Sequence, residues 1–173
     1  MLVYDVRELL ADPRLVIAID ETVDAPSLSS GGQTCRVLTD PQVMGTISNL
    51  DGEVLRAVGE IRFTLEALCD RCLEPVTVPL EIHFEQRFAQ DTAKSEAAKD
   101  QEVEPFQGYQ LDLREVIQEE IQLGIPMKIL CKEDCLGLCP QCGQNRNLGS
   151  CSCVLQDEDP RLSGLRALWQ ERK

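Results

Sequence analysis

The stretch from Leu130 to Cys153 reads LCKEDCLGLCPQCGQNRNLGSCSC and holds six of the nine cysteines in this 173-residue chain. Two more cysteines form a CDRC step earlier in the sequence. Tetrahedral zinc takes four thiolates, and cysteines separated by two residues on a tight turn can reach one ion without strain. The cysteines therefore predict two four-thiolate zinc sites. The expected metal ligands are Cys69, Cys72, Cys131, Cys135, Cys139, Cys142, Cys151 and Cys153.

The strongest motif within this stretch is CPQCG, from Cys139 to Gly143. Proline at the second position presets the turn, and glycine after the second cysteine relieves the backbone where amide groups fold around a sulfur. The motif predicts a zinc knuckle.

Two ways of sharing the cysteines between the metals remain open. Chain order places Cys69 and Cys72 with Cys131 and Cys135, and leaves the last four cysteines together. An interleaved arrangement instead pairs the two CxxC steps around one ion, as in a zinc ribbon. We favour chain order, because short loops lose less entropy on closure.

The start of the chain argues against a secreted, disulfide-bonded protein. Residues 1–10 include Tyr4, Asp5, Arg7 and Glu8, so they contain no apolar run of signal-peptide length. No segment approaches the roughly 18 apolar residues of a membrane helix. We therefore expect a cytoplasmic protein without a membrane partner, in a compartment where clustered thiols bind metal more often than they form disulfides.

The formal charge of −13 is concentrated in the first part of the chain. Residues 1–127 carry 10 basic and 24 acidic side chains, whereas residues 128–173 carry 7 basic and 6 acidic ones. An acidic surface repels phosphate backbones, so the charge disfavours nonspecific nucleic-acid binding. Any contact with RNA is expected to be local or to pass through a protein partner.

Strand patterns dominate the sequence before the cysteine-rich stretch. Alternating apolar residues predict strands near residues 15–19, 34–67 and 76–88, with a hairpin turn at residues 49–52 and a loop at 25–33. Short helices are expected after Asp5 and after Asp112, where Glu115 could complete a capping box and Gly124 ends the helix. The pattern predicts an α+β fold, rich in β structure, built as a partly open barrel or sandwich of antiparallel strands.

Two domains are expected. Residues 1–126 form the β-rich domain, with a flexible acidic loop near residues 89–105. Residues 127–173 form the cysteine-rich zinc module and a C-terminal helix that begins at Asp159 and Pro160. No metal-binding or catalytic role is predicted for Cys35 or His83. Cys35 is expected to be a half-buried thiol, and His83, the one histidine, a solvated surface residue.

Five segments together resemble the YceD family, the bacterial and plastid large ribosomal RNA subunit accumulation proteins. They are CDRCLEP at residues 69–75, LGIPMKILC at 123–131, CKEDCLGLCPQCGQNRN at 131–147, CSC at 151–153 and DPRLSGLRAL at 159–168. The similarity runs from about Ile61 to Leu168, and residues 1–60 share only the β-rich character. It implies a role in large-subunit ribosome biogenesis without a known catalytic activity.

We therefore expect a noncatalytic factor whose zinc module is rigid and whose acidic strands dock on a basic partner, such as a ribosomal protein or a large-subunit precursor. The polar residues beside the cysteine turns are candidates for contact with the partner or with RNA, although Arg71 could instead balance thiolate charge. They are Arg71, Lys132, Asn145, Arg146, Asn147 and Arg161.

Two alternatives share the same cysteines. A thiol–disulfide oxidoreductase or redox sensor would use a CxxC dithiol, made reactive by neighbouring Arg71 or Lys132. The β-rich run before Cys69 does not offer the βαβ setting of a thioredoxin-type site, which counts against this alternative. Four thiolates also suit iron, so the sequence leaves an iron–sulfur protein open.

Overall fold

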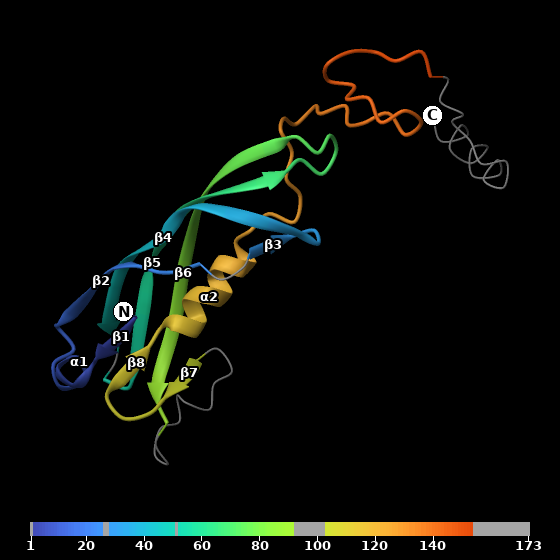
Figure 1. The fold of residues 1–173 in the computed structure, drawn as a ribbon. Helices are drawn as coiled ribbons and strands as arrows, with labels where there is room; N and C mark the ends of the chain where they lie inside the picture. The colour runs from blue at the N-terminus through green and yellow to red at the C-terminus, as the bar shows by residue number, and fades with distance from the viewer. Residues whose placement is uncertain (1, 26–27, 51, 92–102, 154–173) are drawn as a thin grey trace, which may run out of the picture.

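The computed structural model describes residues 2–25, 28–50, 52–91 and 103–153 (Figure 1). Within them the chain forms eight strands and two short helices, which confirms the strand-rich character with few helices. In chain order these are β1 (Val3–Asp5), α1 (Arg7–Ala11), β2 (Val16–Thr22), β3 (Leu28–Ser30), β4 (Gln33–Asn49), β5 (Val54–Leu68), β6 (Pro75–Gln90), β7 (Val103–Phe106), β8 (Gln110–Asp112) and α2 (Arg114–Leu123).

The main sheet has the strand order β2-β4-β5-β6-β7, with β3 paired to part of β4. A separate two-stranded sheet joins β1 to β8. Barrel closure needs the first and last strands to pair, and the described strands leave β2 and β7 as open edges. The sheets are therefore open, and the expected partly open barrel or sandwich does not form. Purely antiparallel pairing was also wrong, because β6 and β7 run parallel.

The hydrophobic core lies between the main sheet and α2, which crosses one face of the sheet in Figure 1. Ile117 and Ile121 of α2 are buried in the same cluster as Ile61 of β5 and Ile82 and Phe84 of β6. Alternate residues of β5 and β6 point to this core, as the period-2 pattern predicted. Burial of such aliphatic side chains, each worth about 2 kcal/mol, holds the helix on the sheet.

The helix start differs from the predicted capping box. Leu113 is the N-cap residue and makes no side-chain cap hydrogen bond. The Asp112 carboxylate instead accepts the Arg114 backbone N–H at 3.0 Å, and the Arg114 guanidinium folds back on the same carboxylate. The predicted end at Gly124 is correct, with its N–H donated to the Glu120 carbonyl at 2.9 Å.

Two glycines face each other where β4 crosses the core. Gly45 and Gly59 are register partners, and a Cβ on either would lie 2.3 Å from a backbone carbonyl oxygen of the facing strand. Those oxygens belong to Val58 and Met44. Real Cβ atoms do not approach oxygen so closely, so both positions require glycine.

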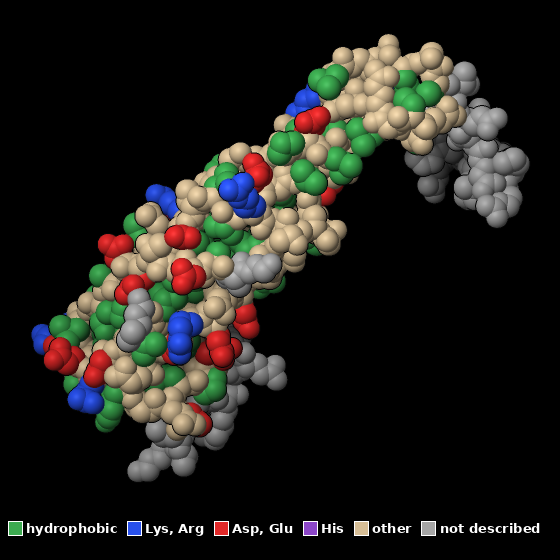
Figure 2. All heavy atoms as spheres, viewed as in Figure 1, with side chains coloured by type: hydrophobic (Ala, Val, Ile, Leu, Met, Phe, Trp, Pro, Cys, Tyr) green, Lys and Arg blue, Asp and Glu red, His purple; other side chains and the backbone are tan. Residues whose placement is uncertain are grey.

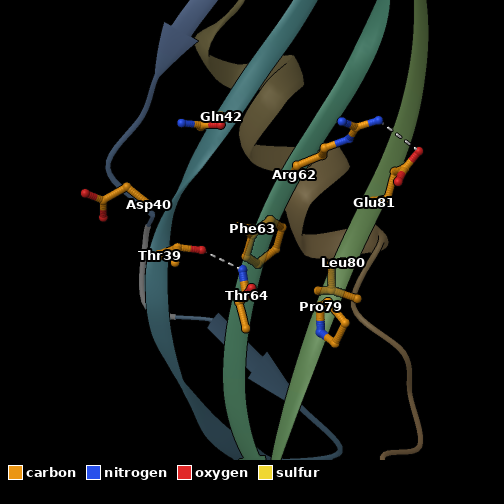
Figure 3. A pocket seen from close by; sticks show the side chains of 9 residues that line it. All are labelled: Thr39, Asp40, Gln42, Arg62, Phe63, Thr64, Pro79, Leu80 and Glu81. Carbon is orange, nitrogen blue, oxygen red and sulfur yellow. Dashed lines mark hydrogen bonds and ion pairs between the residues drawn. The ribbon is translucent and has the colours of Figure 1, made fainter.

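The β4–β5 pairing is irregular near its middle. The register shifts between Val37 and Thr39 and again between Thr39 and Gln42, and the Thr39 hydroxyl accepts the Thr64 N–H at 2.9 Å in place of a ladder bond. A hollow of about 540 Å³ opens over this bulge, lined by side chains of β4, β5 and β6 (Figure 3). Bulges bend strands, and the strands continue past this one as an arm toward the cysteine-rich module (Figure 1).

Two predicted connections need correction. The predicted loop at residues 25–33 contains β3. The predicted acidic loop at 89–105 is shorter at both ends, because Ala89 and Gln90 belong to β6 and β7 begins at Val103. The middle of that loop and the C-terminal helix expected after Asp159 lie outside the described residues. No helix in the described part of the chain is long and apolar enough to cross a membrane.

Candidate metal centres

The first cysteine group joins the β5–β6 turn to the segment that follows α2. The sulfurs of Cys69, Cys72, Cys131 and Cys135 all lie within 4.8 Å of one another. The Cys69–Cys135 sulfur distance is 3.8 Å, and the Cys72–Cys131 distance is 3.6 Å. A tetrahedral ion with metal–sulfur bonds of about 2.3 Å would separate its sulfurs by about 3.8 Å. The geometry can therefore hold a metal ion.

The second group is formed within the cysteine-rich stretch. The sulfurs of Cys139, Cys142, Cys151 and Cys153 also lie within 4.8 Å of one another. Cys139 is buried, Cys142 is exposed and the last two are half-buried, so this group is more open to solvent than the first. This is the grouping by chain order, and the interleaved zinc-ribbon grouping does not occur. Cys35 belongs to neither group; it is buried in β4, and burial raises its pKa.

The two CxxC turns share one backbone geometry. The Leu73 N–H donates to the Cys69 carbonyl at 2.9 Å, and the Gly143 N–H donates to the Cys139 carbonyl at the same distance. The residue after the second cysteine is left-handed in both, with φ of 62° at Leu73 and 74° at Gly143. Leucine thus occupies a conformation that favours glycine, and its side chain is 58% exposed.

Exchanging the residue types at these two positions should change stability in opposite directions. A left-handed L-residue costs about 1–2 kcal/mol, partly offset by the entropy that glycine loses on folding. We expect Leu73→Gly to raise the free energy of unfolding by about 0.5 kcal/mol and Gly143→Ala to lower it by about 1 kcal/mol. Urea denaturation measures both. Gly149→Ala, at a position without positive φ, is the control and should change little; equal effects of all three substitutions would contradict the account.

Backbone N–H groups in each turn are directed at the first cysteine. At Cys69 burial opposes ionisation, but hydrogen bonds from the backbone of Arg71, Cys131 and Cys72 outweigh it and lower the pKa to about 6. At Cys139 the N–H groups of the same turn likewise lower the pKa to about 6. One thiolate in each group is therefore present near neutral pH without any added base.

One cysteine in each group shows the opposite shift. Loss of hydration and hydrogen bonds with neighbouring thiols raise the pKa of Cys131 to about 12. Hydrogen bonding to Cys142 and loss of hydration raise the pKa of Cys153 to about 12. Four thiolates within 4.8 Å repel one another, and a divalent cation removes that repulsion.

Zinc binding should consequently release protons at pH 7. Cys131 and Cys153 carry protons there because of their raised pKa values, and zinc binds the thiolate. Because deprotonation becomes easier as the pH rises, the affinity for zinc should increase with pH. Adding zinc to metal-free protein in weakly buffered solution with an indicator dye measures the protons released. Binding at constant affinity between pH 6 and pH 8 would contradict this assignment.

A polar network outside the cysteines holds the first group in place. The Asp70 carboxylate accepts the Ile129 N–H at 2.6 Å, and the Asp70 N–H donates to the Ile129 carbonyl at 2.9 Å. The Gln33 amide bonds both the N–H and the carbonyl of Leu68 at 2.9 Å. These contacts fasten the turn to β4 and to the segment carrying Cys131. Sequence reasoning missed Asp70 and Gln33, although the position of Asp70 between two cysteines was a usable signal.

Asn145 and Asn147, predicted as contact residues, have their side chains engaged within the module. The Asn147 amide donates to the Cys135 sulfur at 3.3 Å and to the Asn145 side-chain oxygen at 2.9 Å. The Asn145 amide donates to Glu74 at 3.2 Å. The two amides therefore connect the segment after the second CxxC turn to the first cysteine group and to Glu74, which follows the first CxxC turn.

The predicted basic contact residues are more exposed than the asparagines. Arg71 donates to the Cys135 carbonyl at 2.8 Å, and the Lys132 ammonium lies 3.8 Å from Asp134. Arg146 has an exposed side chain, and its backbone N–H bonds the Gly137 carbonyl. Arg161 lies outside the described residues. His83 is 76% exposed on β6, as predicted for a surface histidine.

Comparison with known proteins places these features in a family. Residues 57–169 match the family model described as large ribosomal RNA subunit accumulation protein YceD. The uncharacterized protein YlbN of Bacillus subtilis is 27% identical over 173 residues, covering 97% of this chain and 96% of YlbN. An uncharacterized protein of Mycobacterium tuberculosis is 37% identical over 76 residues, which cover 43% of this chain.

The match spans only 37% of that mycobacterial protein's length. An uncharacterized protein of Mycobacterium leprae is 27% identical over 148 residues, or 82% of this chain and 65% of the relative. No solved structure matches the chain. The family match covers well over half of the sequence and includes both cysteine groups, as the resemblance from Ile61 onward implied. The protein therefore belongs to the YceD family.

Proposed function

We propose that this protein is a noncatalytic, zinc-binding factor of the cytoplasm that supports accumulation of large-subunit ribosomal RNA during ribosome biogenesis. The family description supports the ribosomal role. The observation that carries the zinc assignment is the gathering of eight cysteines into two groups of four, with sulfur separations suited to a tetrahedral ion. In this proposal each group binds one zinc ion.

The proposed work of the metal is structural. The described stretch from Cys131 to Cys153 contributes two ligands of one group and all four of the other, while its leucines at 136 and 148 are exposed. Such a segment has no apolar core of its own, so ligand binding supplies its folding energy. The zinc-ordered surface would then present Arg71, Lys132 and Arg146 to a ribosomal protein or a large-subunit precursor.

Purification of the tagged chain from extract, after cross-linking, tests the ribosomal role. We expect large-subunit precursor RNA and its proteins to be enriched over small-subunit components, with zinc present in the same sample. A Cys69→Ser/Cys135→Ser variant, lacking the first site, is the matched control and should lose the enrichment. Equal recovery of both subunits would overturn the assignment to the large subunit. Recovery of neither subunit, together with thiol–disulfide exchange activity, would overturn the proposal in favour of an oxidoreductase. A brown, iron-containing sample would overturn the choice of zinc alone.

A further inference from the structure

Strand β2 forms one edge of the main sheet. It pairs with β4 from Val16 to Thr22, and no other strand in the described part of the chain pairs with its second side. The edge at the opposite end, β7, has four residues and includes Pro105, which lacks an N–H. Seven residues without proline make β2 the more complete template for an added strand.

The register shows which backbone groups of β2 face outward. The Val23 N–H donates to the carbonyl of Pro41 at 3.0 Å, and Val23 lies opposite Pro41 if the β2–β4 register is continued by one residue. Hydrogen-bonded positions alternate along an antiparallel pair, so residues 17, 19 and 21 bond to β4. The N–H and carbonyl groups of Val16, Ala18, Asp20 and Thr22 therefore point away from β4. The side chains of these four residues are exposed.

Charge and apolar surface restrict what can pair with this edge. Asp20 lies on the edge strand and Asp24 follows it, while Leu15 and Val16 are 42% and 58% exposed at its start. Figure 2 shows acidic side chains over the end of the molecule where β1, α1 and β2 lie, with fewer basic ones. A second copy of the chain, with its net charge of −13, and a phosphate backbone would both be repelled. A basic polypeptide is the complementary partner.

We propose that β2 binds an extended, lysine- and arginine-rich segment of a partner protein, which adds to the main sheet as an edge strand. Backbone hydrogen bonds to the four outward residues supply affinity, and the acidic side chains select a basic sequence. The inference deepens the proposed function, on which its ribosomal context rests, by naming the chemistry of the protein partner. It does not depend on either metal site.

Fluorescence anisotropy with a labelled nine-residue peptide of alternating lysine and valine tests the proposal on the purified full chain. Ala18→Pro removes an outward N–H while leaving the bonds to β4 in place, and should weaken binding at least tenfold. Asp20→Lys should weaken it severalfold through charge. Ala18→Val, which keeps the N–H, is the matched control and should bind within twofold of the native chain.

Two modified peptides keep the test decisive if Ala18→Pro fails to fold. The lysine–valine peptide methylated on alternate backbone nitrogens keeps its charge and loses its donors, so it should bind at least tenfold more weakly. A glutamate–valine peptide should not bind. Equal binding of the methylated and unmodified peptides would overturn strand addition, and equal binding of the acidic peptide would overturn the charge selection. If the peptide binds but the cross-linking purification recovers no large-subunit precursors, the binding site on β2 is supported and the ribosomal role is rejected.

Discussion

Replacing Cys135 by serine should reduce the zinc content of the purified protein from two ions per chain to one. Cys135 is 2% exposed, and its sulfur lies 3.8 Å from that of Cys69 and 3.3 Å from the Asn147 amide. A serine hydroxyl is not ionised near neutral pH and ligates zinc poorly, so the first site would be left with three thiolates. Elemental analysis of protein purified without added metal measures the change.

The loss should also loosen the contact between the strand arm and the module. Cys131 and Cys135 follow α2 in the chain and lie beside Cys69 and Cys72 of the β5–β6 turn. Because the metal would hold these two segments together, amides from Ile129 to Cys135 should lose protection from hydrogen exchange in the variant. Cys35→Ser, which removes a buried cysteine outside both groups, is the control and should retain two ions. Two ions in the Cys135→Ser protein would show that Cys135 is not a required zinc ligand.

Gly59→Ala should destabilise the protein by about 3 kcal/mol, the largest effect expected of a single methyl group here. The added Cβ would lie 2.3 Å from the Met44 carbonyl oxygen and 2.8 Å from the Gly45 Cα, so β4 and β5 would have to separate. That movement would weaken the ladder at the centre of the sheet and displace Phe84, whose ring lies 3.0 Å from the same position. Urea denaturation followed by circular dichroism measures the change.

Ser48→Ala is a suitable control, because Ser48 is half-buried on β4, the strand that pairs with β5 at Gly59. It should alter the free energy of unfolding by less than about 0.5 kcal/mol. Gly45→Ala should match Gly59→Ala, since its Cβ would meet the Val58 carbonyl oxygen at 2.3 Å. If both glycine substitutions were as mild as Ser48→Ala, the two strands would not approach as closely as described.

Local chemistry made some features predictable from the sequence. The cysteine spacing predicted two groups of four. The lower entropy cost of closing short loops favoured grouping by chain order, and the sulfur positions confirm that grouping. Period-2 alternation gave the long strands, and turn residues gave the β4–β5 hairpin, where the Gly52 N–H bonds the Asn49 side chain at 2.7 Å. Each of these depends on short motifs whose residues lie close together in the chain, although the first cysteine group joins two such motifs that are 59 residues or more apart.

Features that depend on distant contacts were missed. Alternation shows which side chains share a face but not which strands are edges, so the open sheet was mistaken for a partly closed one. The parallel β6–β7 pair and the short β3 strand carry little periodic signal of their own. Gln33 holds the first CxxC turn from 35 residues away, and no local pattern marks that contact.

Native mass spectrometry of the full chain, purified without added metal, tests whether the two cysteine groups hold zinc. We expect a mass that exceeds the metal-free chain by two zinc ions, with the eight clustered cysteines unreactive toward thiol reagents under native conditions. Acidification should remove both ions, and the eight clustered thiols should then react with reagent once the metal-free protein is returned to neutral pH. A folded, metal-free protein whose clustered cysteines react individually with thiol reagent would contradict this expectation.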